Sequence, residues 1–153
     1  MSHRLNEKLS QPAAVKKFHL GVYAIIQRGQ SILLVKKSRG PYLGMWDLPG
    51  GRPVHGETIF QTLQREVREE TGVQLVDAVL HSNHAFVVEY KEGKEAISLH
   101  HTCLIYIATQ FDAAHFKENI HEEDVAGCAW IETSQLPHLS LSKVVLCAKL
   151  YKN

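Results

Sequence analysis

Cysteine is scarce in this sequence, and long apolar runs are missing. Only three cysteines occur among the 153 residues, at positions 103, 128 and 147, and no two of them have CxxC spacing. The odd count and the apolar surroundings favour buried thiols over disulfides or a zinc site. No segment approaches the roughly 20 apolar residues of a membrane helix, and the polar start MSHRLNEKLSQPAAVKKF is not typical of a signal peptide. We therefore expect a cytoplasmic protein without membrane contacts.

A surplus of charge is lacking as well. The 17 Lys and Arg residues nearly balance the 16 Asp and Glu residues, which leaves a formal net charge of +1. Nothing in this balance indicates a nucleic-acid polymer or an acidic membrane as a partner. The 10 histidines are scattered and form no metal-binding tract. The length suggests one domain, placed at residues 17–153 behind a polar arm over residues 1–16 that is interpreted as a loose segment or a short helix.

Strand-like patterns dominate what is present. The segments HLGVYAII and SILLVKK flank Gln27–Gln30 and predict a β-hairpin. A second pair of strands, within residues 75–90 and 95–111, flanks the turn Lys91–Lys94, and CAWIE predicts a short strand at residues 128–132. The chain is therefore expected to build most of its core from sheet.

Two helical patterns complete the domain. The first covers residues 58–71, with Gly72 placed to end it in a left-handed conformation, and the second covers residues 141–152. Residues 38–51 are rich in Gly and Pro and are expected to form a structured loop around a short strand, and the polar residues 112–124 are expected to be a loop.

The first helix carries three carboxylates within five residues. At 100° per residue, Glu66, Glu69 and Glu70 lie at the margin of the apolar stripe that contains Leu63 and Val67. Like charges at these spacings cost about 0.2–0.5 kcal/mol per pair even on an exposed helix. Either neighbouring basic side chains offset the repulsion, or a hard divalent cation such as Mg²⁺ or Mn²⁺ does.

The surrounding residues favour the cation. From Gly51 to Val73 the chain reads G-x5-E-x7-R-E-V-x-E-E-x-G-V. This resembles the Nudix box of the Nudix hydrolases, G-x5-E-x7-R-E-U-x-E-E-x-G-U with U a bulky aliphatic residue, at every specified position. The lead-in Trp46–Gly50 and the order of the elements from Phe18 to Leu150 are also similar to that family.

The resemblance implies the Nudix fold, an α/β architecture with a mixed β-sheet sandwiched between α-helices. It also implies a Mg²⁺-dependent hydrolase, with Mn²⁺ as a substitute, that cleaves a phosphoanhydride bond in a nucleoside diphosphate linked to another moiety X. The resemblance further implies that water activated by the metal attacks phosphorus and that the partner is a small nucleotide. The oligomeric state is left open, with a homodimer as one option.

Residue roles follow from the same resemblance. Glu69 and Glu70 match metal ligands, and Glu66 matches either a ligand or the base that deprotonates water. The backbone carbonyl of Gly50 matches a further metal contact. A carboxylate outside the box often assists in this family, and Glu123 is the candidate among residues 122–124.

Two box residues have a supporting part. Glu57 and Arg65 match positions that pair with each other, and such a pair would hold the loop before the helix and orient the carboxylates.

Residues outside the box carry weaker signals. Tyr42, Trp46, Phe86 and Tyr90 are able to stack on a base, although core packing explains each of them as well. Lys36, Lys37 and Arg39 are candidates for phosphate contacts, and His100 and His101 point to opposite faces of one strand.

Tyr90 lies 17 residues after Val73, and no proline occurs between Pro53 and Pro137. In the Nudix family a tyrosine at this distance is associated with dinucleoside polyphosphates, and a proline with ADP-ribose. The expected preference is therefore for a dinucleoside polyphosphate. Oxidised nucleoside triphosphates stay open as an alternative, because the lead-in Trp46–Gly50 is similar to that branch of the family too.

Two rival functions remain. A Nudix-fold module that binds or senses a nucleotide without hydrolysis would be favoured by a damaged box, but this box is intact. A Nudix-fold isomerase of prenyl diphosphates would need an active-site cysteine, and no motif supports that role for any of the three cysteines.

Overall fold

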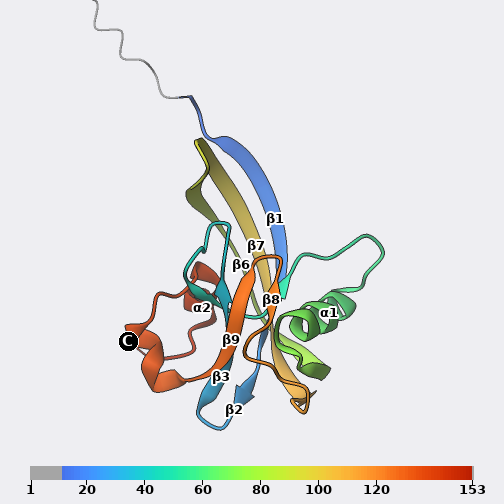
Figure 1. Ribbon diagram of the computed structural model, residues 1–153. Helices are drawn as coiled ribbons and strands as arrows, with labels where there is room; N and C mark the ends of the chain where they lie inside the picture. The colour runs from blue at the N-terminus through green and yellow to red at the C-terminus, as the bar shows by residue number, and fades with distance from the viewer. Residues whose placement is uncertain (1–11, 153) are drawn as a thin grey trace, which may run out of the picture.

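Two β-sheets packed between two helices make up residues 12–152, the part of the chain that this computed structural model describes (Figure 1). Residues 1–11 of the predicted arm lie outside it. The elements follow in the order β1 (Val15–Ile25), β2 (Gln27–Arg28), β3 (Ser31–Lys37), β4 (Trp46–Asp47), β5 (Gly50–Gly51), α1 (Ile59–Thr71), β6 (Gln74–Glu92), β7 (Glu95–Asp112), β8 (His121–Glu122), β9 (Val125–Glu132), the 3-10 helix η1 (Thr133–His138) and α2 (Lys143–Ala148).

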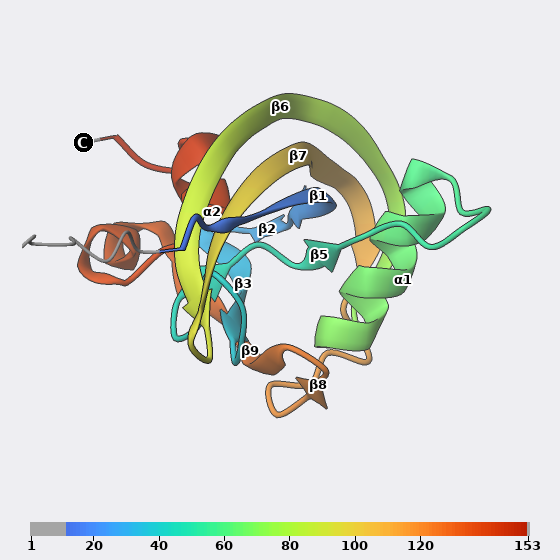
Figure 2. The same ribbon diagram turned by 90° about the horizontal axis from the view of Figure 1, so that it is seen from above.

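The first sheet has the order β5-β1-β7-β6, and the second runs β2-β3-β9-β8 with β4 also paired to β3. β1 runs parallel to β7, whereas β6 and β7 form a long antiparallel hairpin. Figure 2 shows β6 curving as the outer strand around β7 and β1, with α1 and α2 on opposite sides. The mixed sheet between helices that the sequence predicted is therefore confirmed.

The predicted hairpin between residues 19–26 and 31–37 is largely wrong. Only the short strand β2 pairs with β3, in the register Gln27↔Ile32, while β1 joins the other sheet. The reason is that Val22–Ile26 is buried on both faces, which suits a central strand between β5 and β7 better than a two-stranded hairpin. β1 also begins at Val15, inside the stretch expected to be an arm.

Alternation along β1 divides the core into two layers. Val22, Ala24 and Ile26 pack in the cluster that includes Leu63 of α1. The intervening Tyr23 and Ile25 pack on the other side, in a second cluster that holds residues of α2, here Val144, Val145 and Ala148. Each layer thus binds one helix to the sheets.

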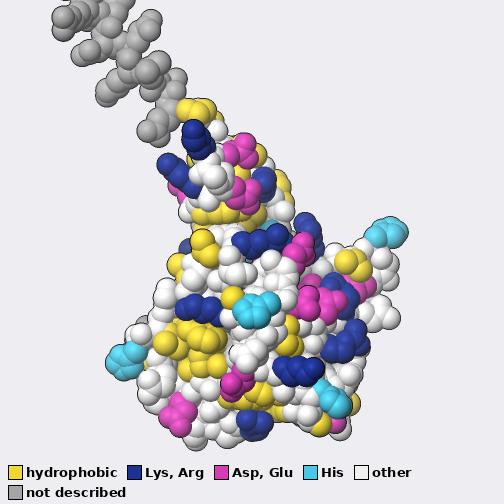
Figure 3. Space-filling model, viewed as in Figure 1, with side chains coloured by type: hydrophobic (Ala, Val, Ile, Leu, Met, Phe, Trp, Pro, Cys, Tyr) yellow, Lys and Arg dark blue, Asp and Glu magenta, His cyan; other side chains and the backbone are white. Residues whose placement is uncertain are grey.

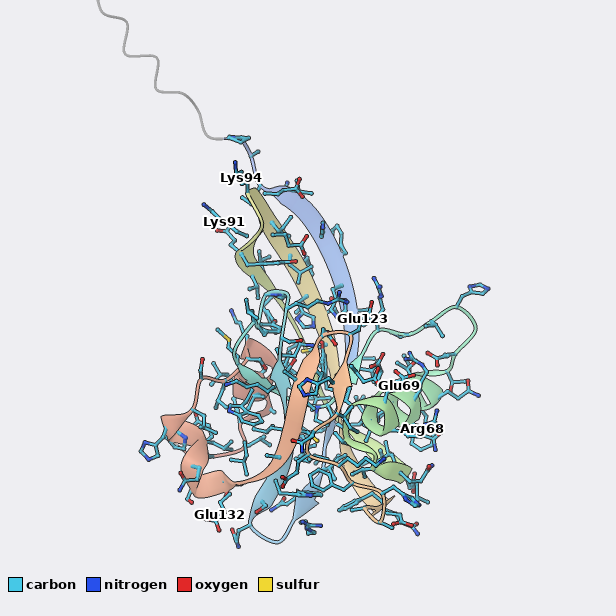
Figure 4. All side chains as sticks on the ribbon, in the orientation of Figure 1. Arg68, Glu69, Lys91, Lys94, Glu123 and Glu132 are labelled. Atoms are coloured by element: carbon cyan, nitrogen blue, oxygen red, sulfur yellow. The ribbon has the colours of Figure 1, made fainter. Side chains whose placement is uncertain are left out.

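The β6–β7 hairpin is confirmed and is longer than the sequence predicted. Its turn end, with Lys91 and Lys94 at the tip, projects beyond the helices together with the first half of β1 (Figures 1 and 4). Phe18 on this projection is 81% exposed. The inner face of the projection forms a wall of the cleft described below.

The predicted closing helix over residues 141–152 is wrong in length. α2 has six residues, with Ser142 capping its start and Lys149 in the left-handed conformation (φ 52°) ending it. Val144, Val145 and Ala148 use up its apolar face, so packing supports no further turn. Within residues 12–152, no helix combines the length and apolar character needed to span a bilayer.

Candidate active site

Helix α1 is held firmly at both ends. Thr58 and Gln61 form a capping box, and the N–H of Gly72 (φ 77°) donates to the carbonyl of Arg68. Leu63 and Val67 are fully buried beneath it, as the predicted apolar stripe requires. The carboxylates on the next face of α1 are therefore presented by a rigid element.

The three carboxylates of α1 lie at three depths. Glu69 is exposed, Glu66 is partly buried and Glu70 is only 3% exposed. One oxygen of Glu70 accepts a hydrogen bond of 2.7 Å from the N–H of Gly50. Burial raises the pKa of Glu70 well above its ordinary value, although Lys37 and this hydrogen bond oppose the shift. Burial also raises the pKa of Glu66, with Arg65 acting against it.

Arg65 compensates much of the repulsion. Its Nε and Nη2 donate to both oxygens of Glu57 at 2.7 and 2.9 Å, and its Nη1 donates to Glu66 at 2.9 Å and Glu69 at 3.3 Å. The hydrogen bonds from Arg65 are the main cause that lowers the pKa of Glu57 to about 2. The predicted pairing of Glu57 with Arg65 is thus present, and Arg65 also orders two of the three helix carboxylates.

The glycine pair before the box allows close approach. Gly50 has φ 154°, and a Cβ on it would collide with the backbone carbonyl of Val22 on β1. A Cβ on Gly51 would strike the carboxylate of Glu66. At position 50 the obstacle is backbone, so only glycine lets the segment lie this close to β1, whereas a side chain at position 51 would displace the carboxylate of Glu66.

An acidic cavity of about 390 Å³ opens beside α1. Its lining brings together all of the predicted metal-site residues, Gly50, Glu66, Glu69, Glu70 and Glu123. Figure 3 shows acidic and basic side chains mixed on the α1 side of the molecule, and Figure 4 shows Glu123 near Glu69 of α1, both of which line this cavity. We call this space, lined also by Glu122 and Asp124, the acidic cavity.

The residues that fit a metal here are oxygen donors, which suits a hard divalent cation. In the side-chain positions described for residues 12–152, however, no three of the acids are gathered closely enough to hold an ion. Arg65 occupies oxygens of Glu66 and Glu69 that a metal would use. A cation would therefore have to draw these carboxylates together.

Two further ion pairs line the acidic cavity. Lys37 donates to Asp124 at 2.6 Å, and Arg39 pairs with Glu123 at 3.1 Å. Glu123 is 84% exposed in its side chain, whereas Asp124 is half as exposed at 41% and helps to raise the pKa of Glu66 and Glu70. Of the two acids, Asp124 is therefore the one whose charge acts on the carboxylates of Glu66 and Glu70.

A second, aromatic cavity of about 570 Å³ adjoins the first. Tyr23, Tyr42, Tyr90 and His101 line it. The two cavities share a boundary made of His19, Tyr23, Lys37, Arg39, Arg52 and Asp124. One continuous cleft therefore has an acidic end, a cationic middle and an aromatic end.

His101 lies at the base of the aromatic cavity. It is 1% exposed, and its Nε2 and Nδ1 are hydrogen-bonded to the hydroxyls of Tyr23 at 2.9 Å and Tyr42 at 2.7 Å. His100, its neighbour, is exposed on the other face, as the strand alternation predicted.

Among the predicted aromatic residues, Tyr42 and Tyr90 line the cavity, whereas Trp46 and Phe86 pack against the core. Among the predicted phosphate contacts, Lys37 and Arg39 line the cleft, but the ammonium of Lys36 lies over the Trp46 ring instead.

Sequence reasoning missed several residues of the cleft, among them His19, Tyr23, Asp47 and Arg52. Asp47 is 2% exposed and accepts hydrogen bonds from Ser142 at 2.7 Å and from the N–H of Leu48 at 2.8 Å. Burial raises its pKa to about 6. The sequence offered one signal for these residues, namely that Asp47 is an isolated acid in the lead-in to the box. Tyr23 gave none, because it looks like an ordinary core residue of a strand.

Comparison with known proteins agrees with this geometry. A family model described as the NUDIX domain matches residues 17–147. The nucleoside triphosphatase NudI of Escherichia coli is 33% identical over 128 residues, which cover 79% of this chain and 86% of that protein. An ADP-ribose pyrophosphatase of Methanocaldococcus jannaschii is 36% identical over 76 residues, 46% of this chain and 45% of the relative, so this chain matches less than half of its length.

Solved structures give the same result. A MutT NUDIX hydrolase from Burkholderia pseudomallei superposes with a TM-score of 0.67 at 28% identity, covering 86% of this chain and 95% of that one. With its complete box, its mixed sheet between helices and a family match over most of its length, the chain belongs to the Nudix family of hydrolases.

Proposed function

We propose that this protein is a Mg²⁺-dependent hydrolase of a nucleoside diphosphate linked to another moiety, with water attacking phosphorus. The observation that carries the proposal is the continuity of the cleft, in which the acidic cavity and the aromatic cavity share a boundary that includes Lys37, Arg39 and Arg52. An elongated ligand with a planar base at one end and phosphates in the middle matches this sequence of surfaces.

The acidic end is suited to the metal. Glu66, Glu69 and Glu70 would hold the cation together with the Gly50 carbonyl, because oxygen donors on a rigid helix beside a tight glycine turn meet the needs of Mg²⁺ or Mn²⁺. When bound, the cation would neutralise the diphosphate and lower the pKa of water. It would also favour the ionised form of Glu70, whose burial otherwise raises its pKa.

The chain's own residues supply the rest. Arg65 orients Glu66 and Glu69 through its hydrogen bonds, and Lys37, Arg39 and Arg52, which line the cavity, would face the phosphates. As the alternative to binding the cation, Glu66 stays the candidate base, because it is partly buried and burial raises its pKa. Outside the box we retain Glu123 as a candidate ligand and add Asp124, which has the stronger influence on the pKa of the helix carboxylates.

A thiol-dependent isomerase is a poor fit. Burial raises the pKa of both Cys103 and Cys128 to about 11, and the pKa of Cys147 is raised as well, so none is poised as a thiolate. The intact set of box carboxylates likewise favours hydrolysis over a module that only binds nucleotides.

Two substrate classes deserve a direct comparison. Tyr90 lines the aromatic cavity, in keeping with the proposed preference for dinucleoside polyphosphates. The likeness to NudI, named a nucleoside triphosphatase, favours nucleoside triphosphates as the second candidate. The cytoplasmic location and the homodimer stay predictions from the sequence.

Hydrolysis in ¹⁸O-labelled water tests the proposal. The protein is incubated with Mg²⁺ and a panel of nucleoside triphosphates, dinucleoside polyphosphates, nucleotide sugars and ADP-ribose, and the products are identified by mass. We expect the label on a phosphate product, no turnover in EDTA, and recovery when Mg²⁺ is restored. Binding without turnover across the panel would instead favour the sensing module, and label on a carbon-bound oxygen would exclude attack on phosphorus.

A further inference from the structure

A buried carboxylate that no step proposed above uses lies in the wall of the aromatic cavity. Asp47 on β4 is 2% exposed, and it lines this cavity but not the acidic one. Its Oδ1 atom accepts both of its hydrogen bonds, from the hydroxyl of Ser142 at 2.7 Å and from the N–H of Leu48 at 2.8 Å. The second oxygen, Oδ2, has no hydrogen-bond partner among residues 12–152.

This second oxygen of Asp47 is open to the aromatic cavity. Within the described part of the chain, Nε1 of Trp130 is the only fully buried side-chain nitrogen or oxygen that lacks a partner. Since Oδ2 of Asp47 also lacks a partner, it must keep contact with open space, and the aromatic cavity is the space that Asp47 lines. Oδ2 therefore faces whatever ligand enters this cavity.

Donors of the protein near Asp47 are used elsewhere. Burial, followed by the charge of Asp47, raises the pKa of Tyr23 and of Tyr42, so both hydroxyls feel that charge. Each hydroxyl is hydrogen-bonded to His101 instead, at 2.9 and 2.7 Å. The ammonium of Lys37 has an ion pair of its own at 2.6 Å. A donor for Oδ2 therefore has to come from a ligand or from water.

Structure alone does not call for a charge at position 47. An asparagine oxygen would accept the same two hydrogen bonds without a charge to desolvate, whereas burial of the Asp47 carboxylate raises its pKa to about 6. The ionised form still dominates at pH 7.5, which lies above that pKa. Oδ2 therefore presents the cavity with an acceptor that carries negative charge.

A negative oxygen here repels phosphates, which the cationic middle of the cleft attracts instead. It suits an N–H donor, and the exocyclic amino groups of adenine, guanine and cytosine are such donors on planar bases. We propose that Oδ2 of Asp47 accepts a hydrogen bond from the exocyclic amino group of the ligand's base, so that the cleft selects nucleotides with an amino-bearing base. The inference rests on the proposed function in taking the ligand to be a nucleotide.

Backbone contacts on one side of β4 help to fix the direction of this carboxylate. The N–H of Trp46 donates to the carbonyl of Ser140, and the N–H of Ser142 donates to the carbonyl of Trp46, each at 2.8 Å. The Ser142 hydroxyl that donates to Asp47 also caps α2, by accepting from the N–H of Val145 at 3.2 Å. Oδ1 is therefore held by the start of α2, and Oδ2 is left toward the cavity.

Three matched pairs of nucleoside diphosphates test the proposal, because the members of each pair differ only in the amino group. They are ADP and purine riboside diphosphate, GDP and IDP, and CDP and the diphosphate of pyrimidin-2-one riboside. Dissociation constants are measured by calorimetry in EDTA at pH 7.5, so that turnover plays no part. In the wild type we expect the amino member of at least one pair to bind about tenfold more tightly, and that pair identifies the base.

Asp47→Asn should abolish or reverse this preference. The N–H of Leu48 can only donate, so the amide oxygen takes the place of Oδ1 and the amide NH₂ takes the place of Oδ2. A donor then meets the amino donor, and the preference for the amino member should fall by about tenfold or more. Asp77→Asn, the same change at an exposed acid, should keep the wild-type preference, and a thermal melt checks that both variants fold.

The wild type gives a readout that needs no variant. The ¹³C signal of the Asp47 carboxyl should move when the amino member of the selective pair binds and stay in place with the other member. No selectivity in any pair, no binding to the wild type, a preference that Asp47→Asn leaves unchanged, or an equal loss of affinity for both members, as a ribose contact would give, would each overturn the proposal. Turnover with Mg²⁺ is scored separately: hydrolysis without base selectivity removes only this inference, and selectivity without hydrolysis removes only the proposed function.

Discussion

Arg65 holds Glu57 with two parallel hydrogen bonds, from Nε at 2.7 Å and from Nη2 at 2.9 Å. The same guanidinium also donates to the carbonyl of Arg52 at 3.1 Å and to the carboxylates of Glu66 and Glu69. One side chain thereby joins the loop before α1 to the acidic face of α1. These contacts are consistent with the prediction that Glu57 and Arg65 hold the loop before α1 and orient its carboxylates.

Arg65→Lys should preserve the positive charge but lose the forked geometry that links Glu57 to Glu66. We expect kcat to fall by about 10–100-fold, as when other supporting contacts of metal ligands are lost, with a smaller effect on KM. Steady-state kinetics and a thermal melt measure the two effects. Arg68→Lys is the control, because Arg68 lies on the exposed side of the same helix (Figure 4). Equal losses in both variants would contradict the positioning role.

Glu69→Gln and Glu70→Gln should each reduce turnover by about 10²-fold or more, since each removes the charge of a proposed metal ligand but keeps the side chain's shape. Glu132→Gln, remote from the cleft in Figure 4, is the control. Near-normal turnover in both active-site variants would refute the metal assignment.

Glu70→Gln should also stabilise the metal-free protein at neutral pH. Burial raises the folded-state pKa of Glu70, so its contribution to stability is present at low pH and is lost as the pH rises through that pKa. Glutamine retains an oxygen for the N–H of Gly50 and carries no charge to desolvate. Urea unfolding in EDTA at pH 7 measures the gain, and a less stable variant would show that Glu70 is well compensated without metal.

Asp47→Asn should change how stability depends on pH. The pKa of Asp47 is raised from 3.8 to about 6, chiefly by burial, so its contribution in the wild type is full below pH 3.8 and is lost as the pH rises through about 6. The variant should match the wild type near pH 4 and exceed it by roughly 1–3 kcal/mol at pH 7.5. Urea unfolding at both pH values tests this, with exposed Asp77→Asn as the control.

Tyr90→Ala should weaken the proposed preference for a dinucleoside polyphosphate. The Tyr90 hydroxyl donates to Glu92 at 2.8 Å, and both residues line the aromatic cavity. The wild type is expected to show a higher kcat/KM for the dinucleoside polyphosphate than for ADP-ribose, and Tyr90→Phe should retain most of that ratio through stacking. A wild-type preference for ADP-ribose, or an unchanged ratio in Tyr90→Ala, would leave only the general class.

Local sequence determined the features that depend on near neighbours. The capping box of Thr58 and Gln61, the left-handed Gly72 and the apolar stripe beneath α1 are all set within a few residues of each other. The β6–β7 hairpin around Gly93 follows from alternation and a short turn. The acidic face of α1 was predictable for the same reason, since helix geometry alone places Glu66, Glu69 and Glu70 together.

Only the tertiary structure decided what depends on distant partners. β1 lies parallel to β7 instead of pairing with β3, because burial on both faces rewards a central place in a sheet. The difference in depth between Glu69 and Glu70 arises from the approach of Gly50 across 20 residues of chain. His101 meets Tyr23 and Tyr42 over separations of 78 and 59 residues. Side chains with such separations come together through strand register and sheet order, which no local pattern specifies.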